Sequence, residues 1–97
     1  MPAANALSIS DALVEYLRES GLEQSVLEVQ IEEVWPQVMG DVVTRLTRSV
    51  EVKKGVLFVR VNSAAIKAQL FENRFELVRK LNEAVGAQVI RDCRILG

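Results

Sequence analysis

Histidine is absent from this sequence, and cysteine occurs once, at Cys93. Histidine is the usual general base near neutral pH and the commonest metal ligand, so its absence removes the simplest route to either kind of site. One cysteine cannot build a thiolate metal cage, and without a neighbouring histidine it is not activated as a nucleophile. We therefore expect Cys93 to be a small core residue.

Glycine-rich phosphate loops are missing too, because the five glycines are isolated from one another. Acids such as Glu32 and Glu33 are adjacent in a predicted helix, where neighbouring side chains point to different faces and cannot share a substrate. These gaps indicate a binding protein rather than an enzyme, with no cofactor, no metal and no small-molecule substrate.

No segment approaches the roughly 20 apolar residues that span a membrane. The first ten residues lack the basic start and apolar stretch of a signal peptide, and a single cysteine fits a reducing compartment. We expect a cytoplasmic protein without membrane association. A length of 97 residues suits one domain over residues 1–97.

Charge is present in quantity but is unevenly distributed. Residues 1–40 contain one basic and seven acidic residues, whereas residues 41–97 contain eleven basic and six acidic ones. A basic half can face phosphates, and an acidic segment can face a basic surface of a partner or of the same chain. The alternative is that these charges have no binding role and only keep the protein soluble.

Two helices are predicted in the acidic half. The first covers residues 8–21, from a serine cap to a glycine. The second runs from about Gln24 towards Trp35, with apolar residues three and four positions apart. Pro36 predicts a kink or a restart directly after Trp35, because proline lacks the N–H of a helical hydrogen bond. Gly40 should end the new turn.

The hydrophobic period changes to two from Leu46, which predicts a strand up to Lys53. A second strand is predicted over residues 56–61, and the short link through Lys54 and Gly55 indicates a hairpin. A third strand, over residues 88–96, should join this hairpin.

A helical stripe separates the second and third predicted strands, and Asn62 or Ser63 can cap its start. The polar stretch at residues 72–74 predicts a break into two helices, although Phe71 and Phe75 could carry one continuous helix through it. The fold class is therefore α+β, with a three-stranded sheet covered by helices on one face. With two helices, residues 24–96 follow the order αββααβ of the type II KH fold.

Several fragments, in order and at compatible spacing, resemble the DciA-type family of bacterial proteins. They cover about two-thirds of the chain: W-x-x-V-x-G from Trp35, K-x-G-V-L-x-V-x-V from Lys53, N-S-x-x-x-x-x-x-L from Asn62, L-N-E-x-V-G from Leu81 and V-I-x-x-x-x-I from Val89.

This resemblance implies a KH-like domain, with residues 1–22 as an N-terminal helical extension and residues 23–97 as the core. It also implies a non-enzymatic adaptor that binds the replicative DNA helicase of the DnaB type, assists its loading and can bind DNA.

Trp35 is the candidate partner contact. A sole tryptophan in a small domain is usually part of the core, yet tryptophan is also enriched in interface hot spots. An indole at a helix break, with one edge packed and the other exposed, would satisfy both interpretations. We expect Trp35 and its helix to contribute to the helicase contact.

A basic set is the candidate nucleic-acid contact. We expect it to bind single-stranded or double-stranded DNA weakly, with little sequence preference. The set comprises Arg45, Arg48, Lys53, Lys54, Arg60, Lys67 and Arg74.

A stand-alone KH-like RNA- or DNA-binding protein is the alternative function. KH domains clamp the nucleic-acid backbone with a glycine loop. The corresponding link here reads Phe71-Glu72-Asn73-Arg74, without a glycine and with an acid. This link disfavours backbone clamping of the KH kind.

Overall fold

The computed structural model describes residues 12–13, 15–16 and 21–97. Its elements are α2 (Glu23–Met39), α3 (Asp41–Leu46), β1 (Thr47–Lys53), β2 (Val56–Val61), α4 (Ala64–Glu72), α5 (Arg74–Val85) and β3 (Asp92–Leu96). The predicted helix over residues 8–21 lies largely outside the described residues. The α+β class is confirmed, and the order β-β-α-α-β after the first helices is compatible with a KH-like fold.

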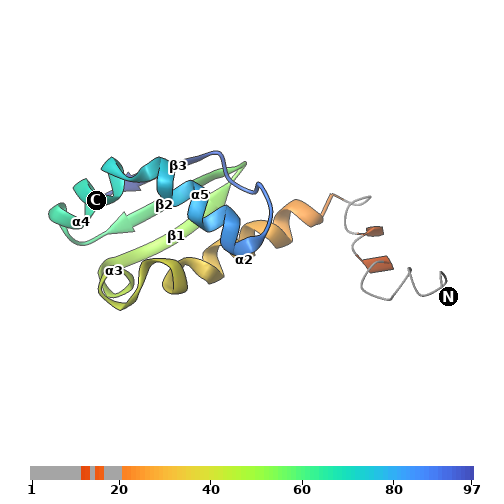
Figure 1. Cartoon of the computed structure of the whole chain (residues 1–97), viewed down its shortest axis with the longest axis horizontal. Helices are drawn as coiled ribbons and strands as arrows, with labels where there is room; N and C mark the ends of the chain where they lie inside the picture. Colours follow the sequence, from red (N-terminus) through yellow and green to blue (C-terminus); the bar gives the residue numbers. More distant parts are fainter. Residues whose placement is uncertain (1–11, 14, 17–20) are drawn as a thin grey trace.

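The sheet has the strand order β1-β2-β3. β1 and β2 are antiparallel, and β3 runs parallel to β2. The helices α2, α4 and α5 lie on one side of the sheet (Figure 1). Burial alternates accordingly along β2: Leu57 and Val59 are fully buried under the helices, whereas Phe58 and Arg60 point to the opposite, uncovered side.

The predicted hairpin is confirmed. Lys53 pairs with Val56, so that Lys54 and Gly55 form a two-residue turn. Their φ angles are 52° and 80°, and positive values at both positions are what a type I′ turn requires. Glycine adopts this conformation without steric cost, which explains why the turn is placed at Gly55.

The predicted restart of the helix at Pro36 is wrong. α2 continues through Pro36 to Met39, and the hydrogen bond from Gly40 N to the Pro36 carbonyl, at 2.9 Å, shows that helical pairing resumes after the ring. Ile31 and Trp35 are both buried on one face of α2, and this burial outweighs the hydrogen bond that proline removes. The chain turns instead at Gly40, with φ 85°, into the unpredicted short helix α3.

The predicted break between two helices is confirmed at Asn73. The Ser63 hydroxyl caps α4 by accepting a hydrogen bond from Ile66 N at 3.2 Å. Phe71 and Phe75, on either side of the break, do not continue the buried stripe; they are 54% and 71% exposed.

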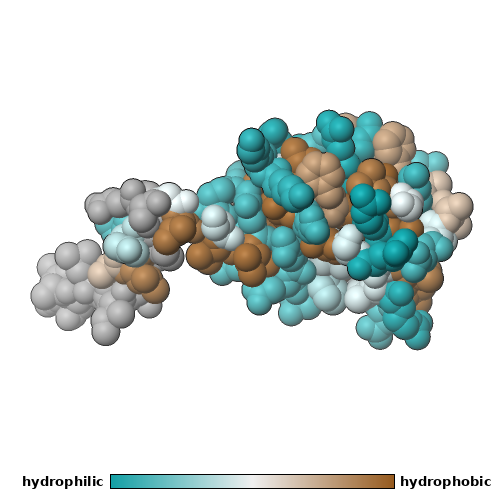
Figure 2. Space-filling model, turned by 180° about the vertical axis from the view of Figure 1, so that it is seen from behind, coloured by the Kyte–Doolittle hydropathy of each residue, from teal (hydrophilic) through white to brown (hydrophobic). Residues whose placement is uncertain are grey.

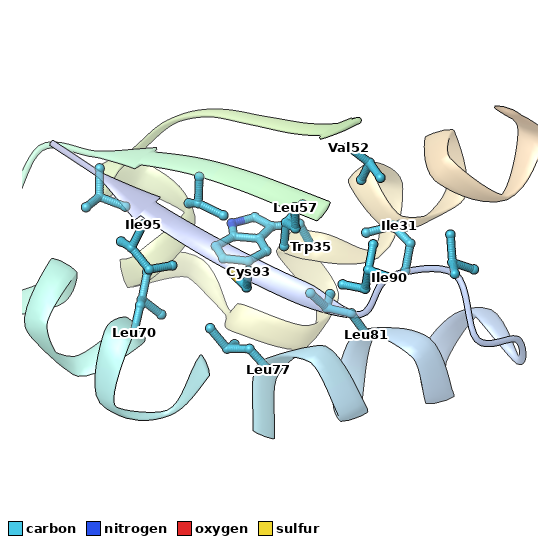
Figure 3. Packing of buried hydrophobic residues seen from close by; sticks show 13 residues of the cluster. Ile31, Trp35, Val52, Leu57, Leu70, Leu77, Leu81, Ile90, Cys93 and Ile95 are labelled. Atoms are coloured by element: carbon cyan, nitrogen blue, oxygen red, sulfur yellow. The ribbon is translucent and has the colours of Figure 1, made fainter. Parts of the chain in front are cut away.

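β3 joins the hairpin as predicted but begins only at Asp92. Val89 and Ile90, which the alternating pattern placed in the strand, are buried in the preceding loop. They are held there by the side chain of Asn82 on α5, which contacts the backbone of both residues. The core therefore includes a loop as well as the sheet and helices (Figure 3).

Candidate partner and nucleic-acid interfaces

Trp35 is a core residue, 2% exposed. Figure 3 shows its ring among Ile31, Leu57 and Cys93, between the sheet and the helices. Its Nε1 donates a hydrogen bond to Thr47 Oγ1 at 3.3 Å, so the polar edge of the indole is also turned inward. The predicted exposed edge is therefore wrong, because the helix does not break beside Trp35 and both faces and the polar edge of the ring are buried. Trp35 can therefore affect partner binding only indirectly, by positioning the helices and strands that it packs against.

Cys93 is buried in β3 at 3% exposure, as expected for a core residue. Burial in the apolar core raises the pKa of its thiol to about 12, and the neighbouring Asp92 carboxylate raises it further in the same direction. The thiol is therefore neutral at physiological pH.

Alkylation should detect this burial. At pH 8 we expect iodoacetamide to modify Cys93 about a thousandfold more slowly in the folded chain than in urea, because only the thiolate reacts. The pKa of the thiol is higher in the folded state than in the unfolded state, where it is near 8.5. Keeping the thiol protonated therefore contributes its full share to the free energy of unfolding below about pH 8.5, and this share is lost as the pH rises towards 12. Equal rates in the folded and unfolded states would contradict the placement of Cys93.

The predicted basic set does not form one patch, because the topology divides it between the two ends of the sheet. Lys53 and Lys54 lie at the hairpin tip. Arg60 is four residues from Val56 along β2, which separates their backbones by about 13 Å. Arg45 in α3 and Lys67 in α4 lie towards the Arg60 end, where the Lys67 side chain lies beside Gly97.

The hairpin tip is tied to the loop before β3. Arg91, which the sequence analysis did not select, donates from its guanidinium to the Lys54 carbonyl, and its backbone N donates to the Gly55 carbonyl at 2.8 Å. Lys53 is paired with Glu51 at 3.6 Å, an exposed ion pair that contributes little to stability. The two lysines are thus presented on a fixed turn.

A β-bulge adds Arg48 to the other end of the sheet. The register shifts between Thr47 and Ser49, so Arg48 and Ser49 together lie opposite Arg60. Arg48 is exposed. The irregularity therefore brings two arginines from adjacent strands to one place, which a regular alternation would not predict.

Arg74 lies apart from the other cations, at the junction of α4 and α5. Its guanidinium carbon is 4.3 Å from the centre of the Phe71 ring and 4.6 Å from that of Phe75, and its Nη1 donates to the Phe71 carbonyl at 3.0 Å. The two exposed rings were not selected as site residues from the sequence. The sequence contains a signal that could have identified them, because both phenylalanines lie where the apolar stripe of the helices becomes polar.

Over the described residues, no group of three or more acidic or cysteine side chains is arranged to hold a metal ion. None of the described helices is both long and apolar enough to cross a membrane.

The sequence model of the family described as "Dna[CI] antecedent, DciA" matches residues 8–95. The chain belongs to the DciA family. No curated protein matches it. DciA membership suggests a role as a helicase loader in DNA replication, and DciA is not known as a family of enzymes.

Proposed function

We propose that this DciA-family chain is a non-enzymatic adaptor that binds the replicative DNA helicase of the DnaB type and assists its loading on DNA. Weak, sequence-independent nucleic-acid binding through the basic set, including Arg45, Arg48 and Arg60, is an accessory activity. Family membership supports the first part. Exposed cations at both ends of the sheet support the second.

The observation that favours protein binding most is the aromatic junction, defined by Phe71, Arg74 and Phe75. Two phenylalanine rings at 54% and 71% exposure leave apolar surface in water, which a partner would remove. Aromatic residues and arginine are the types enriched in protein interfaces, and the guanidinium between the rings holds them in place. We propose this junction, rather than the indole of Trp35 itself, as the direct helicase contact. Trp35 then contributes by fixing the core beneath.

Sedimentation velocity with the replicative helicase of the same organism tests the function. The parent chain is expected to co-migrate with the helicase, and the double variant Phe71→Ser/Phe75→Ser to lose this co-migration, because the apolar contact is removed. A matched control is Val29→Ser/Val42→Ser, two valines that are 52% and 58% exposed on other helices. The control should still co-migrate.

Two results would contradict the proposal. If the parent chain does not bind the helicase, the loader function fails; if labelled DNA shifts in the same experiment while the helicase sediments alone, the stand-alone nucleic-acid-binding function takes its place. If the parent binds and the Phe71/Phe75 variant binds equally well, the function stands but the junction is not the contact. Circular dichroism melting of each variant separates lost binding from lost folding.

A further inference from the structure

The side of the sheet opposite the helices is uncovered, and Figure 2 shows the molecule from behind, where hydrophilic and hydrophobic side chains are interspersed. Its residues are the outward-facing members of all three strands. They form three rows across the sheet: Ser49, Arg60 and Leu96; Glu51, Phe58 and Arg94; Lys53, Val56 and Asp92. We call this surface the open sheet face.

Phe58 lies at the centre of the open sheet face and is only partly buried. Its register partners are Glu51 on β1 and Arg94 on β3, and Arg60 follows two residues later on the same side of β2. Beside the ring is a hollow of about 220 Å³, lined by residues that include Ser49, Phe58 and Arg60. This volume is below the roughly 300–1,000 Å³ of sites for whole small-molecule ligands, so it suits a single ring-sized group.

The charges on this face favour an anionic ligand. Glu51 is engaged by Lys53 at 3.6 Å, and the Asp92 Oδ1 accepts from Cys93 N at 2.7 Å. Arg60 and Arg94 form no ion pair within the described part of the chain, so both guanidinium groups are available. Arg48 adds a third, from the bulge opposite Arg60.

An aromatic ring between guanidinium groups matches the chemistry of one nucleotide. A base stacks on a phenyl ring whatever its identity, and the phosphates on either side bind arginine. A base inside a duplex is already stacked and cannot reach the ring, so a single strand fits and a duplex does not.

We propose that the open sheet face binds single-stranded nucleic acid, with one base stacked on Phe58 and the adjoining phosphates on Arg60 and Arg94. This inference rests on the accessory nucleic-acid affinity proposed above and gives it a site. Phe58 and Arg94 lie outside the set predicted from the sequence. The site also lies on the opposite side of the sheet from the α4–α5 junction, where a KH domain would clamp its ligand.

Fluorescence anisotropy with a labelled oligothymidine and a duplex of equal length tests the site at low salt. Phe58→Leu keeps an apolar strand residue but removes the ring, and should weaken oligothymidine binding about 5- to 150-fold, the range expected for one stacked base. Phe58→Tyr keeps the ring and should bind like the parent. Arg60→Gln/Arg94→Gln should reduce the slope of log affinity against log salt by about 1.4, that is, about 0.7 for each lost phosphate contact with a single strand. Lys80→Gln, an exposed cation on α5, is the charge control and should change little.

The inference is overturned if Phe58→Leu binds oligothymidine as tightly as the parent, or if the duplex binds at least as tightly as the single strand. Absence of any binding by the parent would overturn it together with the accessory nucleic-acid affinity. Neither result bears on the helicase contact, which sedimentation measures separately, and Phe58→Leu should still co-migrate with the helicase. Thermal melting of each variant confirms that the sheet is intact.

Discussion

Replacing Trp35 with alanine is expected to lower the free energy of unfolding by about 3–5 kcal/mol, the range for removing a large buried aromatic side chain. The side chain is 2% exposed and lies between α2 and the sheet. Little can move into the space it leaves, because Ile31 and Leu57 beside it are already fully buried. Since a small domain has only about 5–15 kcal/mol of stability in total, the variant should be close to unfolding at 37 °C.

Trp35→Phe is the matched control for this prediction. It keeps an aromatic ring in the core but loses the hydrogen bond from Nε1 to Thr47 Oγ1. The threonine hydroxyl still donates to the Val43 carbonyl at 2.7 Å, so it is not left without a partner. We therefore expect a loss smaller than that of Trp35→Ala.

Urea unfolding followed by circular dichroism measures both losses. If Trp35→Ala costs less than about 1 kcal/mol, the side chain is not the core residue that this structure describes. Helicase binding by folded Trp35→Phe should equal that of the parent. If Trp35→Phe binds the helicase more weakly than the parent while its melting temperature is unchanged, the indole contacts the helicase directly.

Local signals in the sequence were sufficient for much of the fold. The hairpin follows from a two-residue turn in which Gly55 adopts positive φ, and the start of α4 follows from the Ser63 cap. The helix break at Asn73 follows from the polar interruption of the stripe. In each of these cases the deciding interaction lies within a few residues along the chain, where a pattern can report it.

Features decided by contacts distant in sequence could not be predicted in the same way. Pro36 is tolerated inside α2 because the sheet buries Trp35, and β3 starts late because Asn82, on another element, holds the preceding loop. The same reason explains the candidate sites. Strand register and the bulge at Arg48 decide which cations share a surface. The positions of the basic residues in the sequence reveal neither the register nor the bulge.

Asn82→Ala is expected to produce the second large loss of stability, about 3–5 kcal/mol, since each buried polar group left without a partner costs about 1–3 kcal/mol. Asn82 is 5% exposed. Its Oδ1 accepts from the backbone N–H groups of Val89 and Ile90 at 2.9 and 3.0 Å, and its Nδ2 donates to the Ile90 carbonyl at 2.9 Å. Alanine leaves the N–H and the carbonyl of Ile90 unpaired, and the Val89 N–H keeps only its bond to the Ala87 carbonyl at 3.0 Å, in a loop that carries two core residues.

Asn82→Leu separates the hydrogen bonds from the packing. Leucine fills most of the space of asparagine but satisfies none of the three backbone groups, so this variant should be destabilised about as much as Asn82→Ala. Gln88→Ala is the control on the neighbouring side: Gln88 accepts a bond from Asn82 Nδ2 at 3.1 Å but is exposed, so water can replace it, and the loss should stay within about 0.5 kcal/mol.

Amide hydrogen exchange locates the effect within the chain. In the parent, the amides of Val89 and Ile90 should be protected although they lie outside any strand, because Asn82 is their partner. In both Asn82 variants these two amides should exchange much faster than those of β2. If Asn82→Leu restores both stability and protection, packing alone holds the loop. The hydrogen bonds of Asn82, in the L-N-E-x-V-G fragment, would then not be what holds the loop before β3.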